Sequence, residues 1–174
     1  MDGVEFYYFA YGSNLSYLRM LERTSIDLLL KGKFAWRGCR LTFAKRSADG
    51  SGKCTAMPTT DDHVVWGAIY RLTLADKRKL ATFEVGYQER SLMLPVDGVQ
   101  KLGFTFIADT THIDRSLRPY KWYKRLVVAG AREQGFPSEY IDEIDRIEPM
   151  IDPDAGRCAS YDSILAQIEN ARRV

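Results

Sequence analysis

The feature that restricts the fold most is a pair of apolar, strand-like runs joined by only two residues. The runs are Ser91 to Val96 and Val99 to Ala108, and Asp97-Gly98 lies between them. Asp-Gly between two such runs is a strong short-range signal for a β-hairpin, because a two-residue turn needs positive φ at its central residues. The sequence therefore predicts an antiparallel hairpin over residues 91–108.

More strands are expected before this hairpin, and helices are expected after it. Runs rich in aromatic or β-branched residues predict strands over 4–10, 41–45, 54–59 and 63–72. Apolar spacing and terminal signals predict helices over 120–132, 138–149 and 163–173. Strands followed by helices, without strict alternation, predict an α+β fold. We expect a mixed, largely antiparallel curled sheet or small barrel flanked by helices, with a helical C-terminal third.

Two short helices are predicted between the early strands. One begins at about residue 14, where Ser13 or Asn14 can act as its N-cap. The other follows Thr73, because Asp76 lies three residues later in the arrangement of a capping box. We expect this second helix to run to residue 83 or 84, with Gly86 as its stop.

Length and composition exclude several classes of protein. The chain has 174 residues, which predicts one domain over 1–174. We expect no membrane association, because no run reaches the roughly 18 apolar residues of a spanning helix. The acidic start MDGVEFYY lacks the basic region of a signal peptide, and three widely spaced cysteines form no disulfide or zinc pattern. A cytoplasmic location is expected.

Charge and motif content restrict the chemistry further. A net charge of +2 argues against a nucleic-acid surface, and too few basic residues lie in strands for a nucleic-acid-binding barrel. The sequence has no Walker loop, GxGxxG, HExxH or GxSxG motif. Its two histidines, His63 and His112, have no partner in sequence that would suggest a nucleophile pair. Metal catalysis is also poorly supported, because the acidic residues lie mainly in amphipathic helices, so we expect no metal.

The first candidate site is the loop Tyr11-Gly12-Ser13-Asn14, which ends an apolar strand. Glycine lets a backbone approach a ligand closely. A helix beginning near Asn14 would present unpaired N–H groups and the positive end of its dipole, which suits a carboxylate or an oxyanion. The alternative is a plain strand–turn–helix connection with Ser13 as the cap.

The second candidate is Glu84, in the stretch Phe83-Glu84-Val85-Gly86-Tyr87. A carboxylate near a helix C-terminus and among apolar neighbours should have a raised pKa. Such a group can accept and return a proton near neutral pH. The alternative is an exposed glutamate in a fraying helical turn.

Taken together, four stretches resemble the γ-glutamylcyclotransferase family over nearly the whole chain. They are YFAYGSNL (8–15), VVWGAIYRL (64–72), LATFEVGY (80–87) and YKRLVVAGAREQGFPSEYIDEIDRIEP (123–149). The first is similar to the substrate-binding loop of that family, and the third contains its catalytic glutamate, here Glu84. One difference is that the family commonly has glycine directly after this glutamate, whereas here Val85 intervenes before Gly86.

The resemblance implies an enzyme that needs no cofactor and acts on a small γ-glutamyl substrate. The α-amine of a γ-glutamyl group attacks its own γ-amide carbonyl, which releases 5-oxoproline and a free amine. Glu84 would transfer the proton. The substrate would be bound by the opening loop and two aromatic residues: Tyr11, Gly12, Ser13, Asn14, Leu15, Tyr87 and Tyr123.

The identity of the released amine is left open by the resemblance. Family members act on γ-glutamyl amino acids, γ-glutamylamines, glutathione or a γ-glutamyl-protected metabolite, and the glutathione branch has a different opening motif. The amine is expected to contact either RSADGSGK (46–53) or the stretch 112–121. The rival hypothesis is a non-catalytic small-molecule-binding module on the same fold. Nothing in the sequence specifies an oligomeric state.

Overall fold

The fold is organised around a five-stranded mixed sheet with the order β2-β5-β1-β7-β6. The computed structural model describes residues 5–25 and 28–171. The strands are β1 (Phe6–Ala10), β2 (Leu29–Arg37), β5 (Val64–Leu72), β6 (Tyr87–Val96) and β7 (Val99–Ala108). Every neighbouring pair is antiparallel except β1 and β7, which are parallel. A separate two-stranded sheet joins β3 (Cys39–Arg46) to β4 (Gly52–Pro58).

The predicted hairpin is confirmed. β6 and β7 pair from Val96↔Val99 to Tyr87↔Ala108, so the antiparallel ladder starts directly at the turn. Asp97 and Gly98 have φ values of 51° and 79°, as a two-residue turn between twisted strands requires. The sheet does not close into the small barrel named as one alternative, because β2 and β6 form its two edges. The mixed, largely antiparallel sheet is the form observed.

The β2 strand was missed by the sequence analysis. Its sequence, LLKGKFAWR, contains a glycine with φ of 137° at Gly32, where the register with β5 shifts. Glycine and alternating lysines weaken the strand pattern. Pairing with β5 compensates for this, because it satisfies the backbone of β2 along nearly its whole length.

The helices occur in the predicted order, but several of them begin or end at residues other than those predicted. They are α1 (Tyr17–Arg23), α2 (Leu74–Ala81), α3 (Lys121–Glu133), α4 (Ser138–Asp145) and α5 (Ala155–Ala171), with short 3-10 turns η1 (Ser13–Leu15) and η2 (Thr110–His112). The Thr73–Asp76 capping box is present at the start of α2. However, α2 ends before Glu84, α4 ends four residues before Pro149, and α5 begins eight residues earlier than predicted. Parts of the predicted first strand and last helix, Val4 and residues 172–173, lie outside the described residues.

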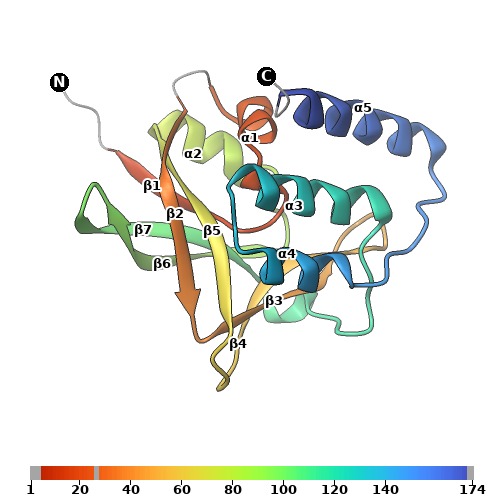
Figure 1. Cartoon of the computed structure of the whole chain (residues 1–174), viewed down its shortest axis with the longest axis horizontal. Helices are drawn as coiled ribbons and strands as arrows, with labels where there is room; N and C mark the ends of the chain where they lie inside the picture. The colour runs from red at the N-terminus through yellow and green to blue at the C-terminus, as the bar shows by residue number, and fades with distance from the viewer. Residues whose placement is uncertain (1–4, 26–27, 172–174) are drawn as a thin grey trace.

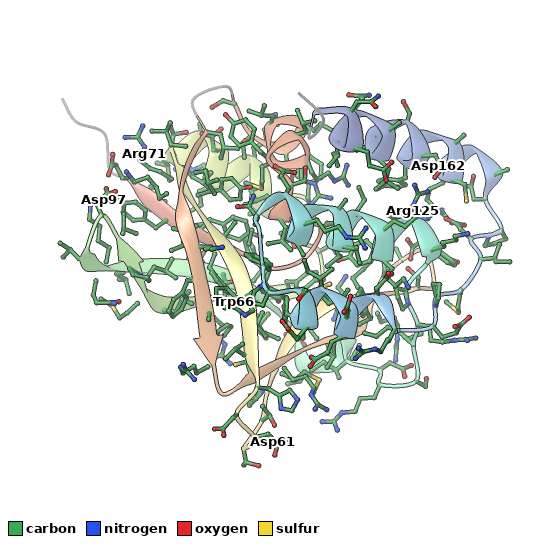
Figure 2. All side chains as sticks on the ribbon, in the orientation of Figure 1. Asp61, Trp66, Arg71, Asp97, Arg125 and Asp162 are labelled. Carbon is green, nitrogen blue, oxygen red and sulfur yellow. The ribbon has the colours of Figure 1, made fainter. Side chains whose placement is uncertain are left out.

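The C-terminal helices pack beside the sheet and against one another. Figure 1 shows α3 and α4 next to β5, with α5 alongside α3. The α3–α5 contact includes a flat stack of the Trp122 and Tyr161 rings, with centroids 3.8 Å apart. Arg125 and Asp162 add an ion pair of 2.9 Å at the surface, labelled in Figure 2. Exposed pairs contribute little, so the aromatic stack is the stronger contact.

Among the described residues, no helix is both long enough and apolar enough to span a membrane.

Gly67 on β5 makes room for the most buried aromatic ring of β1. A Cβ placed on Gly67 would lie 2.4 Å from the Phe9 ring and 2.6 Å from the Ala10 carbonyl oxygen. Phe9 is fully buried and packs edge-on against Phe34 and Trp36 of β2. Since these rings fill the space on that face, an added methyl group forces them or the backbone to shift.

We therefore expect Gly67→Ala to destabilise the protein by about 2 kcal/mol, the usual cost of overpacking a core. Thermal unfolding should show a melting temperature lower by roughly 5 °C. Gly156→Ala is the control, because its added Cβ meets only a carboxylate oxygen at 3.4 Å, in ordinary contact, at the start of α5. A melting temperature for Gly67→Ala equal to that of Gly156→Ala would contradict this account of the core.

Candidate active site

A cavity of about 230 Å³ lies where β1 ends, beside the β3–β4 hairpin and the start of α3. Its walls carry several charged groups and five tyrosines, and most of the residues predicted to form a site line it. The lining residues are Tyr8, Tyr11, Gly12, Ser13, Asn14, Arg23, Lys45, Ser47, Asp49, Lys53, Cys54, Phe83, Glu84, Tyr87, Phe106, Trp122, Tyr123, Arg157 and Tyr161.

The loop after β1 forms one wall through close backbone packing. A Cβ on Gly12 would lie 3.1 Å from the Cys54 Cβ and 3.4 Å from the Tyr123 hydroxyl, so only glycine fits there comfortably. Beyond it the chain makes the turn η1, closed by a 3.1 Å hydrogen bond from Leu15 N–H to the Gly12 carbonyl. The predicted helix from about Asn14 is wrong, because α1 begins only at Tyr17. A helix dipole therefore does not act at this loop.

The N–H groups of the loop are nevertheless available to a ligand. Within the described chain, the backbone N–H groups of Gly12, Ser13 and Asn14 donate to no protein acceptor. Buried N–H groups are nearly always hydrogen-bonded in folded proteins. A carboxylate or a developing oxyanion in the cavity would satisfy them, so the loop can bind an anion through its backbone alone.

The side chain of Asn14 connects three functional groups. Its Nδ2 donates to the Tyr8 hydroxyl and to Glu84 Oε1, each at 3.0 Å. Its Oδ1 accepts from Arg23 Nη1 at 2.9 Å. Because one face of the amide donates and the other accepts, this network fixes the orientation of Asn14 and, with it, that of the Glu84 carboxylate.

Glu84 is held in a tight turn between α2 and β6. Tyr87 N–H donates to the Glu84 carbonyl at 3.1 Å, and Gly86 provides the positive φ, 80°, at the third position of this turn. Val85 occupies the second position and is 74% exposed. The extra residue between the glutamate and the glycine therefore extends into solvent, and the carboxylate still faces the cavity.

Burial raises the pKa of Glu84 above its ordinary value, while Arg23, Asn14 and Lys45 oppose that rise. Its side chain is only 10% exposed, so the alternative of an exposed glutamate in a fraying turn is wrong. The predicted direction of the pKa shift is confirmed, but its cause is different. Desolvation in the cavity is the largest effect, since α2 has already ended at Ala81.

Arg23, the last residue of α1, is the cation nearest the Glu84 carboxylate. Its Nη1 lies 3.5 Å from Glu84 Oε1, and its guanidinium lies 4.9 Å from the centre of the Phe83 ring. Its Nε is buried and has no hydrogen-bond partner in the described chain. A buried guanidinium with unused donors is well suited to bind a second carboxylate.

Three of the tyrosines are fixed by backbone hydrogen bonds around Cys54 and β7. The Tyr87 hydroxyl donates to the Cys54 carbonyl at 2.8 Å, and the Tyr123 hydroxyl accepts from Cys54 N–H at 3.2 Å. The Tyr11 hydroxyl donates to the Phe106 carbonyl. Burial raises the pKa of each of these hydroxyls well above its ordinary value, so they stay neutral and act as hydrogen-bonding groups.

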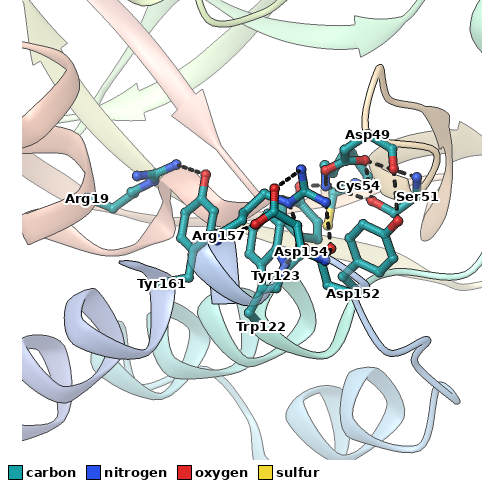
Figure 3. Close-up of polar contacts among 12 residues, drawn as sticks. Arg19, Asp49, Ser51, Cys54, Trp122, Tyr123, Asp152, Asp154, Arg157 and Tyr161 are labelled. Carbon is teal, nitrogen blue, oxygen red and sulfur yellow. Dashed lines mark hydrogen bonds and ion pairs between the residues drawn. The ribbon is translucent and has the colours of Figure 1, made fainter. Parts of the chain in front are cut away.

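The far wall of the cavity is built by the β3–β4 hairpin, α3 and α5 (Figure 3). Lys53 Nζ lies 2.7 Å from Asp49 Oδ2 and 4.5 Å from the centre of the Trp122 ring. Asp152 accepts hydrogen bonds from Trp122 Nε1 at 2.7 Å and from Arg157 Nε at 2.6 Å. These contacts hold the start of α5 against α3, so the C-terminal helix contributes directly to the site.

Comparisons with known proteins find relatives in sequence and in fold. A model of the AIG2-like family matches residues 64–144, which include Glu84, Tyr87 and Tyr123. A γ-glutamylcyclotransferase from Bos taurus is 25% identical over 154 residues, covering 85% of this chain and 81% of that protein. A solved structure described as a γ-glutamyl cyclotransferase superposes with a TM-score of 0.77 at 21% identity, covering 94% of this chain and 99% of that one. An uncharacterised protein from Homo sapiens gives a TM-score of 0.76 at 21% identity, with 93% and 98% covered.

In sequence and in fold, the chain is similar to γ-glutamylcyclotransferases.

Most of the residues that this family resemblance predicted meet at the cavity, but Leu15 does not. Glu84, Tyr11, Gly12, Ser13, Asn14, Tyr87 and Tyr123 all line it. The Leu15 side chain is fully buried in the core, and a Cβ on Gly130 of α3 would lie 2.6 Å from its Cβ. Leu15 therefore packs in the core of this chain and does not line the cavity.

Several lining residues were missed, and few of them carry a sequence signal. Ser47, Asp49 and Lys53 of the stretch RSADGSGK line the cavity, whereas no residue of 112–121 does. Contact of the released amine with either stretch stays a prediction. Tyr8 lies within the quoted opening motif. Arg23, Arg157 and Tyr161 resemble ordinary surface residues of short helices, so only the fold could place them in the site.

Proposed function

We propose that this chain is a γ-glutamylcyclotransferase, converting a γ-glutamyl amide into 5-oxoproline and a free amine by intramolecular aminolysis. The observation that carries the proposal is the buried Glu84 carboxylate, whose pKa is raised and which is held by Asn14 at 3.0 Å in a cavity with unpaired backbone donors. A carboxylate in this state can transfer protons near neutral pH.

In this proposal, the glutamyl group binds at the wall formed by the opening loop and Arg23. The N–H groups of Gly12, Ser13 and Asn14 and the unused donors of Arg23 would bind the α-carboxylate or the carbonyl oxygen as it gains charge. The glutamyl chain of the substrate would lie beside the side chains of Tyr11, Tyr87 and Tyr123. Holding the chain folded places its amine against its own carbonyl, which supplies the entropic part of catalysis.

Proton transfer would be the task of Glu84. The free α-amine has a pKa of about 8, so it is mostly protonated at neutral pH and cannot attack. Glu84 would accept this proton as the amine nitrogen bonds to the γ-carbonyl carbon. When the original amide C–N bond breaks, the same carboxylic acid would protonate the departing nitrogen. The ring nitrogen still carries a second proton that the neutral lactam does not keep, and the regenerated Glu84 carboxylate would pass this proton to the released amine. One carboxylate can serve both nitrogens, because they are bonded to the same carbon atom in the tetrahedral intermediate.

The compartment we propose is the cytoplasm. Cys39, Cys54 and Cys158 are all free thiols in the structure, which is the usual state in a reducing compartment.

The test is to incubate the purified protein with γ-glutamyl amino acids, γ-glutamylamines and glutathione, and to measure 5-oxoproline by mass spectrometry. We expect 5-oxoproline from at least one of the first two classes, together with an equal amount of the released amine. Absence of product from the whole panel, with γ-glutamyl compounds still binding, would favour the non-catalytic binding module instead.

A further inference from the structure

Two lysines of the β3–β4 hairpin face each other across the strands at the cavity. Lys45 on β3 pairs with Lys53 on β4, and both side chains line the cavity. Like charges directly opposite each other in an antiparallel pair are destabilising. A register irregularity lies just before Lys45, between Thr42 and Lys45, and irregularities of this kind often reorient a side chain beside an active site.

The two lysines differ in how they are compensated within the protein. Lys53 Nζ lies 2.7 Å from both Asp49 Oδ2 and the Ser51 hydroxyl, and within 5 Å of the Trp122 and Tyr123 ring centres. Lys45 is 6% exposed, and its Nζ lies 4.8 Å from the centre of the Tyr87 ring. Within the described chain, Lys45 Nζ has no hydrogen-bond acceptor and no carboxylate within ion-pair distance.

Each other cation on the cavity wall has a carboxylate partner. Arg23 lies 3.5 Å from Glu84, and Arg157 pairs with Asp152. Within the described chain, Lys45 is thus the buried cation of this cavity that has no direct carboxylate partner, and Glu84 and Asp49 act on it only from beyond ion-pair distance. Burial lowers the pKa of both Lys45 and Lys53, and the positive charge of Lys45 lowers that of Lys53 further. A buried charge without a direct partner is costly, and an anionic ligand between the two ammonium groups would reduce that cost.

The position of the pair indicates which part of a ligand it would meet. Asn14, Arg23 and Glu84 form one wall, where the glutamyl group is proposed to bind. Lys45 and Lys53 belong to the wall built by the hairpin. A substrate with its reacting carbonyl at Glu84 and its glutamyl end at the first wall would direct its amine portion towards the lysines.

We propose that Lys45, with Lys53 beside it, binds a carboxylate on the released amine and thereby selects γ-glutamyl amino acids over γ-glutamylamines. This inference rests on the proposed function, and it assigns to these two residues the recognition of the leaving group. Lys45 provides the ammonium group that has no direct partner in the described chain. Lys53 is held in place by Asp49, and its positive charge adds to the attraction of the ligand carboxylate.

The kinetic test uses two substrates that differ only in that carboxylate, γ-glutamylalanine and γ-glutamylethylamine. We expect the wild type to prefer γ-glutamylalanine, and Lys45→Met to lower kcat/KM for it by about 10- to 50-fold, the loss of one charged hydrogen bond. Activity on γ-glutamylethylamine should fall much less, by the amount that loss of the Lys45 charge near Glu84 causes with either substrate, so the preference for γ-glutamylalanine should fall by about 10-fold or more. Arg46→Met is the control, because it removes a neighbouring cation of the same strand whose side chain is 56% exposed. An equal loss on both substrates would overturn the proposal.

A binding measurement separates this inference from the proposed reaction. Titration calorimetry with the Glu84→Gln protein needs no turnover, so it reports recognition even if the cyclisation assay fails. Tighter binding of γ-glutamylalanine than of γ-glutamylethylamine, lost on adding Lys45→Met, supports the role of Lys45. Equal binding of the two ligands, binding of neither, or no effect of Lys45→Met would refute it. Thermal unfolding of each variant establishes that it is folded.

Discussion

Replacing Glu84 with glutamine is expected to lower the turnover number for 5-oxoproline formation by about 100- to 10,000-fold, the range contributed by general acid–base catalysis. The amide keeps the shape of the side chain and can keep its contact with Asn14, but it cannot accept a proton from the substrate ammonium. The Michaelis constant should change much less, because Arg23 and the loop of Gly12, Ser13 and Asn14 remain. Steady-state kinetics with the best substrate of the panel measure both quantities.

The folding control for this variant is its stability relative to the wild type as a function of pH, and the structure determines the direction of the expected change. Burial gives Glu84 a folded pKa above its ordinary value, so its contribution to stability is fully present below the unfolded pKa of about 4.3 and is lost as pH rises through the folded pKa. Glutamine does not titrate. Denaturant unfolding between pH 4 and 8 should therefore show the variant becoming more stable relative to the wild type as pH rises. A folded Glu84→Gln protein with wild-type turnover would exclude Glu84 as the proton carrier.

Replacing Asn14 with leucine should have the next largest effect on activity, a loss of about 100- to 1,000-fold in kcat/KM. The change keeps the volume of the side chain but removes its hydrogen bonds to Glu84, Arg23 and Tyr8. Two of these bonds involve charged groups, each of which contributes about 1.5–2 kcal/mol. Glu84 would then lose its orientation as well as a donor to its ionised form.

The pH profile distinguishes this positioning role from simple damage to the fold. The hydrogen bond from Asn14 lowers the pKa of Glu84, so its removal should move the acidic limb of the kcat/KM profile to higher pH. Thr82→Val serves as the control, because it removes an exposed hydrogen bond two residues from Glu84 without touching the cavity. If Asn14→Leu loses activity but the acidic limb of its kcat/KM profile stays at the same pH as in the wild type, Asn14 does not lower the pKa of Glu84.

Features set by neighbours in the chain could be predicted from the sequence. The Asp97-Gly98 turn and the capping box of Thr73 and Asp76 were both placed correctly. Turn and cap geometry depend on the conformational limits and short side chains of a few adjacent residues, so a local pattern is sufficient. The candidate residues Glu84 and Asn14 could be named for a similar reason, since both lie in compact motifs.

Only the tertiary structure decided which side chains share the cavity and what charge they carry there. In the sequence, Lys45 and Lys53 resemble ordinary lysines of a polar hairpin, and Arg23 resembles a surface residue of a short helix. Their burial, their partners and their pKa shifts arise from contacts between β3, β4, α1 and the turn at Glu84, which are far apart in sequence. Desolvation and charge pairing depend on distance in space. The sequence by itself determined the local turns, the order of elements and the motif residues, and the packing of the fold turned them into one charged site.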